Sequence, residues 1–189
     1  MEPRAARLSH TTITELMIPA YANFGGKVHG GVILELMDKA AYACAAKHAG
    51  GYCVTVAVEG VAFRAPIDVG DLVSLHAAVN YVGSSSLLVG IRVEAENVRV
   101  HSVRHTNTSY FWMVAKDDDG NLRQVPPLLL EDRDEVRRYL EAIHRKQMRK
   151  RHAAELDNVE SDLAVEHELH QLDDERCVLA AGLQEELTD

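Results

Sequence analysis

The sequence predicts an α+β fold in which an antiparallel sheet wraps around one long helix. Three observations predict it. One early segment, residues 30–48, has helical composition and is apolar on almost every face. The segments that follow, residues 54–63, 72–82, 86–98 and 100–115, are β-branched or alternating, and short turns separate them. Strands at hairpin spacing, segregated from a single helix, form an antiparallel sheet with the helix on one face.

The elements that precede the sheet are predicted from β-branching and from turn residues. Residues 11–19 are β-branched and alternate loosely, and Pro19 ends the run, so we expect a first strand near a sheet edge. The helix over residues 30–48 consists largely of good helix formers, and Gly50 and Gly51 end it.

The helix over residues 30–48 carries few polar side chains in its middle turns, namely Glu35, Asp38 and Lys39. A helix that is apolar around most of its circumference has to be covered by other elements. One sheet leaves a side of it open. The sequence therefore predicts a homodimer in which a second sheet and helix close that side.

Negative charge is concentrated at the end of the chain. The 189 residues include 29 acidic and 20 basic side chains, and residues 155–189 hold twelve of the acids and one base. We expect a folded domain over residues 1–131, a basic helix over residues 132–154, and an acidic, partly helical or disordered tail over residues 155–189 that folds back on the basic helix. The basic helix lacks a recognised nucleic-acid motif and has few aromatics, so no nucleic-acid partner is expected.

Apolar runs and cysteine spacing indicate the compartment. No stretch approaches the roughly 18 to 20 apolar residues of a membrane span, and the amino terminus lacks the apolar core of a signal peptide, so we expect a cytoplasmic protein. Cys44, Cys53 and Cys177 show no paired metal spacing, which indicates reduced thiols packed as small apolar groups. The His167 and His170 pair does not match a metalloprotease motif, so no metal is expected.

A glycine-rich loop from Asn23 to Gly31 opens directly onto the predicted helix. It aims the free N–H groups of Gly30, Gly31 and Val32, together with the helix dipole, at whatever lies there, which suits an anion or a carbonyl oxygen under attack. The loop is not a Walker motif, because its Gly-Lys pair is not followed by Ser or Thr. The alternative is a connector whose glycines merely permit a tight turn.

Asp38 lies on nearly the same helix face as Gly31, about two turns further along, so its carboxylate is placed to activate a water over a carbonyl at the helix start. The alternative is a solvated polar stripe in which Glu35 and Lys39 form an ordinary i,i+4 pair. The residues alone leave both interpretations open.

Five segments carry a family resemblance: Asn23, His29-Gly30-Gly31, Leu36-Met37-Asp38, Phe63-Arg64-Ala65-Pro66 and Gly83-Ser84-Ser85-Ser86. In this order they resemble the hotdog-fold acyl-CoA thioesterases, namely the bacterial acyl-CoA hydrolases and the cytosolic long-chain acyl-CoA hydrolases of animals. The resemblance runs from about Thr11 to Arg151. It implies a hotdog fold, with the sheet wrapped around the central helix and additional helices after it.

The resemblance also implies an activity, the hydrolysis of fatty acyl-CoA to free acid and CoA, at a site that lies across a dimer interface. Asn23 and Asp38, one from each subunit, are then the catalytic pair, the Gly30 and Gly31 amides polarise the thioester oxygen, and His29 shapes the site. Family members form dimers and often trimers of dimers. No metal or redox cofactor is needed, because a thioester is already activated.

CoA is polyanionic, and several residues are candidates to hold it. The resemblance implies contacts from Arg64 and from Ser84, Ser85 and Ser86, for which the alternative is simple turn chemistry. The basic helix offers Arg145, Lys146 and Arg149 to the CoA phosphates. The alternative for the helix is a solvated face partnered by the acidic tail.

Two other functions compete with thioester hydrolysis. A hotdog hydratase acting on an enoyl thioester would need a His beside a carboxylate, and His29 with Asp38 is the nearby candidate. A regulatory module that binds acyl-CoA without turnover would need neither Asn23 nor Asp38. The presence of both residues favours the enzyme.

Overall fold

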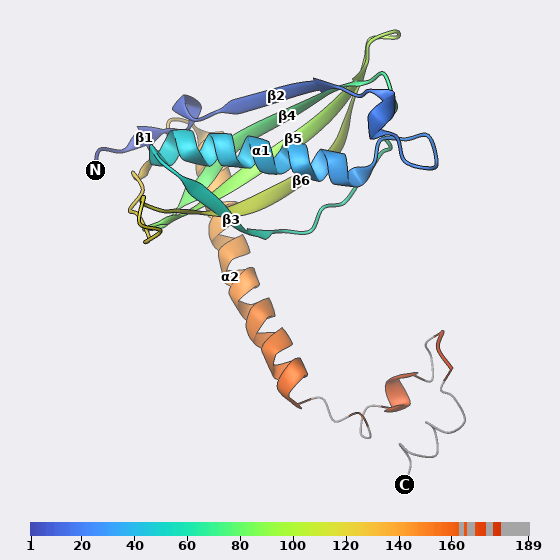
Figure 1. Ribbon diagram of the computed structural model, residues 1–189. Coiled ribbons are helices and arrows are strands. Elements are labelled where there is room, and N and C mark those ends of the chain that lie inside the picture. Colours follow the sequence, from blue (N-terminus) through green and yellow to red (C-terminus); the bar gives the residue numbers. More distant parts are fainter. Residues whose placement is uncertain (163–164, 166–168, 173–175, 179–189) are drawn as a thin grey trace. The chain divides into compact units, whose positions relative to one another are not determined.

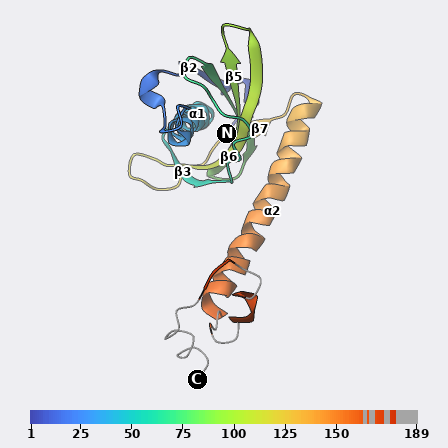
Figure 2. The ribbon, with the colours of Figure 1, turned by 90° about the vertical axis from the view of Figure 1, so that its right-hand side faces the viewer.

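A five-stranded antiparallel sheet curls around one long helix in the computed structural model (Figure 1). The strand order is β2-β4-β5-β6-β3, and every pairing in it is antiparallel. The helix is α1 (Gly30–Ala49), and the strands are β2 (Thr11–Leu16), β3 (Cys53–Val58), β4 (Leu72–Val82), β5 (Ser86–Asn97) and β6 (Ser102–Ala115). The view along α1 shows the strands curving around it (Figure 2). The predicted α+β hotdog fold is confirmed.

The described residues are 1–162, 165, 169–172 and 176–178, and they divide into two compact units, Met1–Ile143 and His144–Asp189. The smaller elements are a parallel pair, β1 (Arg4–Ala5) with β7 (Leu128–Leu129), and the 3-10 turns η1 (Ala6–Leu8), η2 (Pro19–Tyr21) and η3 (Leu169–Leu172). The last long helix, α2 (Arg133–Asp162), runs further than the predicted end at residue 154. Most of the predicted acidic tail, and its predicted contact with the basic helix, lie outside the described residues.

Three predicted strands are shorter by two residues or more in the structure, and the strand predicted over residues 86–98 ends one residue early, at Asn97. The strand predicted over residues 54–63 ends at Val58, since Gly60 and Pro66 interrupt regular pairing there. The strand predicted over residues 11–19 ends at Leu16. The last strand begins at Ser102, because the chain turns through His101, which has a left-handed φ of 52°.

The main core lies between α1 and the concave face of the sheet. The helix buries small and medium side chains there, including Met37, Ala40, Ala41 and Cys44, against alternate sheet residues such as Val89. Leu34 and Tyr42, in contrast, are exposed on α1. One protomer therefore covers only part of the helix, as the sequence predicts. No helix among the described residues is long and apolar enough to span a membrane.

The three free cysteines differ in environment. Cys44 and Cys53 are buried, which confirms the prediction for them, but Cys177 is exposed and the prediction of a packed thiol is wrong there. Burial raises the pKa of the Cys44 thiol to about 12 and that of Cys53 to about 11. Only the thiolate reacts, so at pH 8 we expect Ellman's reagent to label one thiol of the native protein rapidly and all three after denaturation. Rapid labelling of Cys177→Ser would contradict this expectation.

Candidate active site

The glycine-rich loop lies at the amino end of α1 (Figure 1), and hydrogen bonds to the side chain of Asn23 close it. The Asn23 Oδ1 accepts hydrogen bonds from the backbone N–H of Gly25 (2.9 Å) and of Lys27 (3.1 Å), and the Asn23 N–H donates to the Lys27 carbonyl. Gly26 takes a φ of 73°, which favours glycine. The loop thus uses the carboxamide oxygen of Asn23, and within the described residues its Nδ2 group has no acceptor.

His29 caps the first turn of α1. Its Nδ1 accepts from the Gly31 N–H at 2.9 Å, and its carbonyl accepts from the Val32 N–H. The N–H of Gly30 has no acceptor among the described residues and lies at the positive end of the helix dipole. Gly30 is therefore the best placed of the three predicted donors, and the prediction of free N–H groups is wrong for Gly31 and Val32, because both are bonded to His29.

A pocket of about 390 Å³ opens beside this turn. Its lining includes Asn23, Lys27, Gly30, Phe63 and Arg64, from the loop, the helix start and the irregular chain after β3. A Cβ on Gly30 would lie 3.3 Å from the Phe63 ring, so glycine lets the ring cover the helix start. The structure thus brings three predicted site residues, Asn23, Gly30 and Arg64, into one pocket.

Asp38 does not line that pocket. It lies seven residues after Gly31, roughly 10 Å along the helix axis at 1.5 Å per residue. Its side chain is exposed, and its Oδ1 accepts a 2.6 Å hydrogen bond from the hydroxyl of Thr55 on β3. The pairing of β3 with β6 shifts between Thr55 and Ala57, and such a bulge re-aims neighbouring side chains.

Thr55 is a candidate residue that sequence reasoning missed. It belongs to no motif, and its meeting with Asp38 depends on how β3 is placed over α1. The one available signal was a lone hydroxyl in an otherwise apolar strand, Cys53–Val58.

The remaining predicted CoA contacts are not gathered at this pocket within one protomer. Ser86 begins β5 opposite Val114 of β6, whereas Arg64 bonds to Thr106, about 26 Å away along β6 at roughly 3.3 Å per residue. Ser84 and Ser85 lie in the same turn as Ser86. Arg145, Lys146 and Arg149 belong to the second unit, and their contact with CoA stays a prediction.

Metal-binding side chains do not cluster in the described part of the chain, since no group of three or more His, Cys, Asp and Glu is placed to hold an ion. That the reaction needs no cofactor stays a prediction.

Comparison with known proteins identifies the family. Residues 25–101 match the family model described as thioesterase superfamily. The chain is 42% identical over 136 residues to protein VdlD of Helicobacter pylori, covering 72% of this chain and 78% of VdlD. A hexameric acyl-CoA thioesterase has the same fold, with a TM-score of 0.79 and 32% identity over 82% of this chain and 99% of that one.

The acyl-CoA hydrolase of Staphylococcus aureus, solved with butyryl-CoA and CoA, superposes with a TM-score of 0.76 and 29% identity over 84% of this chain and 96% of that one. Structures of three of its variants, each with an Asn, an Asp or a Thr replaced by Ala, are similar as well. The spacing of those three residues along that chain equals the spacing of Asn23, Asp38 and Thr55 here. The chain therefore belongs to the thioesterase superfamily and has the hotdog fold of its acyl-CoA hydrolases.

Proposed function

We propose that the protein is an acyl-CoA thioesterase that hydrolyses fatty acyl-CoA to free acid and CoA. The observation that carries the proposal is the hydrogen bond from the Thr55 hydroxyl to the exposed carboxylate of Asp38 on the central helix. In the same chain, Asn23 lines a pocket at the start of that helix. The spacing of these three residues in the staphylococcal hydrolase supports the same conclusion.

Asp38 acts as the general base. The Thr55 hydroxyl occupies Oδ1, so Oδ2 is left to take a proton from water as the water oxygen attacks the thioester carbon. The negative charge that develops on the carbonyl oxygen is stabilised by the Gly30 N–H and the helix dipole. The C–S bond then breaks, and CoA leaves as the thiolate and takes up a proton.

The two halves of this machinery come from two copies of the chain. Asn23 and Gly30 line the pocket, while Asp38 and Thr55 lie on an exposed face beside the edge strand β3. Apolar side chains gather on this face, exposed by 38% to 55%: Leu34, Tyr42, Tyr52, Val56 and Val58. An exposed apolar edge of this kind favours pairing with a second copy. We infer a dimer in which Asp38 of one protomer meets the Asn23 pocket of its partner, and a trimer of dimers beyond it.

The proposal is tested by thiol release from acyl-CoAs of graded chain length. We expect stoichiometric release of CoA and free acid. Hydration of crotonyl-CoA without thiol release would instead identify a hydratase, and tight binding without turnover would identify a regulatory module. The hydratase has little support here, because the His29 Nδ1 is bonded to the Gly31 N–H. A cytoplasmic location stays a prediction.

Thr55 positions the base, and its removal is expected to change turnover more than binding. In Thr55→Val the shape is kept and the hydroxyl is lost, so Asp38 is no longer oriented; we expect kcat to fall about tenfold with KM nearly unchanged. Thr55→Ser restores a hydroxyl and should recover most of kcat. A rise in KM alone, or no rescue by Ser, would contradict a positioning role.

A further inference from the structure

The pocket beside the start of α1 has walls that lie largely outside the helix and the five-stranded sheet. Residues 63–67, on the connection from β3 to β4, form one wall, and the glycine-rich loop contributes Asn23, Lys27 and Val28 to another. Irregular chain of this kind has no ladder of hydrogen bonds of its own, so its contacts with neighbouring elements set its position. The contacts of these two segments therefore decide the shape of the pocket.

Strand β6 holds the wall of residues 63–67 at two points. The pairing of β5 with β6 is shifted at Thr106, an extra residue in a bulge, and the Thr106 carbonyl accepts from the Arg64 N–H at 2.9 Å. A comparable bulge occurs at Asn80 in β4. Arg104, two residues before Thr106, donates from Nη2 to the Pro66 carbonyl at 3.0 Å. The wall is thus bonded to the sheet through one main-chain and one side-chain donor.

A cluster of four charged residues joins this wall to the glycine-rich loop. The Arg104 Nη2 lies 2.5 Å from the Asp71 Oδ2 and 3.3 Å from the Asp68 Oδ2, and the Asp68 Oδ1 pairs with the Lys27 ammonium. Asp71 is buried, and its Oδ2 also accepts from the Asp68 N–H at 2.9 Å. We call Lys27, Asp68, Asp71 and Arg104 the clamp.

The clamp reaches both halves of the candidate site. On the loop side, the Lys27 N–H donates to the Asn23 Oδ1 at 3.1 Å, and the Lys27 carbonyl accepts from the Asn23 N–H at 2.7 Å. Lys27 and Asp68 are also paired as an antiparallel bridge. On the wall side, the clamp holds the segment whose Phe63 ring covers Gly30. One set of ion pairs therefore fixes the loop and the wall relative to each other.

We propose that the clamp is a positioning device for the proposed thioesterase reaction, with Asp68 as its central residue. Asp68 does not line the pocket, so it acts through Lys27 and Arg104 and not on the substrate. Without the clamp, the loop and the wall take the shape that accepts acyl-CoA for only part of the time, and the apparent affinity falls by that fraction. Once substrate is bound the pocket has its shape, so kcat is retained. The inference rests on the proposed function.

Asp68→Asn keeps the shape of this side chain and removes its charge. We expect KM for butyryl-CoA to rise about tenfold while kcat stays within about twofold of the wild type. The Asp68 side chain is 42% exposed, and exposed ion pairs contribute little to stability, so the thermal unfolding midpoint should stay close to that of the wild type. A merely structural role predicts the reverse, a lower midpoint with unchanged KM, and that result would overturn the proposal.

Lys27→Met separates the clamp from a direct attraction between Lys27 and the CoA phosphates, since Lys27 also lines the pocket. If Lys27 acts through Asp68, the double variant Lys27→Met/Asp68→Asn has a KM no higher than that of the worse single variant. Increases that multiply in the double variant would show that Lys27 acts on the substrate by itself, and the clamp would be rejected.

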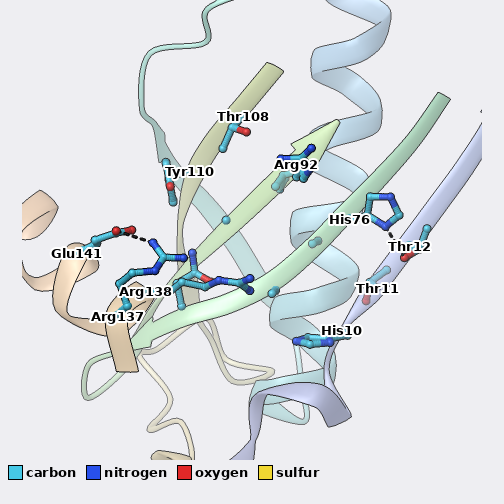
Figure 3. Close-up of a pocket in the computed structure, with 15 residues that line it drawn as sticks. His10, Thr11, Thr12, His76, Arg92, Thr108, Tyr110, Arg137, Arg138 and Glu141 are labelled. Atoms are coloured by element: carbon cyan, nitrogen blue, oxygen red, sulfur yellow. Dashed lines mark hydrogen bonds and ion pairs between the residues drawn. The ribbon is translucent and has the colours of Figure 1, made fainter. Parts of the chain in front are cut away.

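Glu141→Gln is the matched control. Glu141 accepts a 2.6 Å hydrogen bond from the Arg137 Nη1 on the face of the sheet opposite α1 (Figure 3), and it does not line the pocket beside α1. This variant also removes an exposed ion pair, and KM and the unfolding midpoint should both be unchanged.

Calorimetric titration with CoA keeps the two proposals distinguishable. If the wild type releases no thiol from any acyl-CoA, the proposed function is refuted. The clamp is then judged by the dissociation constant for CoA, which should rise about tenfold in Asp68→Asn and stay unchanged in Glu141→Gln. Equal dissociation constants in the wild type and Asp68→Asn would overturn the clamp.

Discussion

Asp38→Ala is expected to lower kcat for acyl-CoA hydrolysis at least ~100-fold, the scale usual for losing a general base. The side chain is exposed, and its hydrogen bond to the Thr55 hydroxyl is lost without leaving a buried charge behind. The thermal unfolding midpoint should therefore stay close to that of the wild type. Thiol release under saturating substrate, with the melting curve measured in parallel, checks both expectations.

Glu35→Ala is the matched control. Glu35 is another exposed carboxylate on α1, less than one turn before Asp38, and it pairs with Lys39 at 2.6 Å. Such surface pairs contribute little, so kcat should be unchanged. Equal rates for Asp38→Ala and the wild type would refute the mechanism, and an equal loss in both variants would show that helix charge, not a specific base, is what matters.

Phe111→Ala is expected to lower the free energy of unfolding by about 3–5 kcal/mol, the usual cost of removing a buried aromatic ring. Phe111 is 1% exposed on β6 and belongs to the main core. It pairs with Val89 on one side and Val58 on the other, so its ring lies where three strands meet α1. Urea unfolding at fixed protomer concentration measures the change, because association would otherwise shift the apparent stability.

Val103→Ala on the same strand is the control for this prediction. Val103 is 60% exposed, and surface replacements of this kind usually change stability by no more than about 0.5 kcal/mol. A loss below about 1 kcal/mol in Phe111→Ala would mean that the core between α1 and the sheet closes around the missing ring.

The fold could be predicted from the sequence because helices and strands show in patterns of neighbouring residues. Alternation of apolar and polar residues along residues 72–82 and 86–98 predicts strands directly. The Ala-rich run before Gly50 predicts a helix, and Gly50 itself predicts where that helix ends. Strand ends were less accessible: residues 59–63 are apolar enough for a strand but find no regular partner, since pairing depends on distant residues of β6.

The candidate site was accessible only where a motif spans a few residues. Asn23, Gly30 and Asp38 could be chosen from one loop and the helix that follows it. Thr55 could not, because its contact with Asp38 depends on the bulge in β3 and on the seating of β3 over α1. The role of His29 as an acceptor for the Gly31 N–H likewise depends on a ring orientation that no spacing reveals.

The bulge at Asn80 has a consequence for how this sheet tolerates insertions and deletions. Val79 pairs with Val89 and Tyr81 with Leu88, so those two pairs are consecutive on β5 while Asn80 stands between them on β4. A chain lacking this one residue would retain both pairs, with Val79 in the main core and Tyr81 in the separate cluster around Trp112. Asn80 is thus an extra residue that the pairing of β4 with β5 does not need, and its deletion is expected to leave the register on both sides of it unchanged.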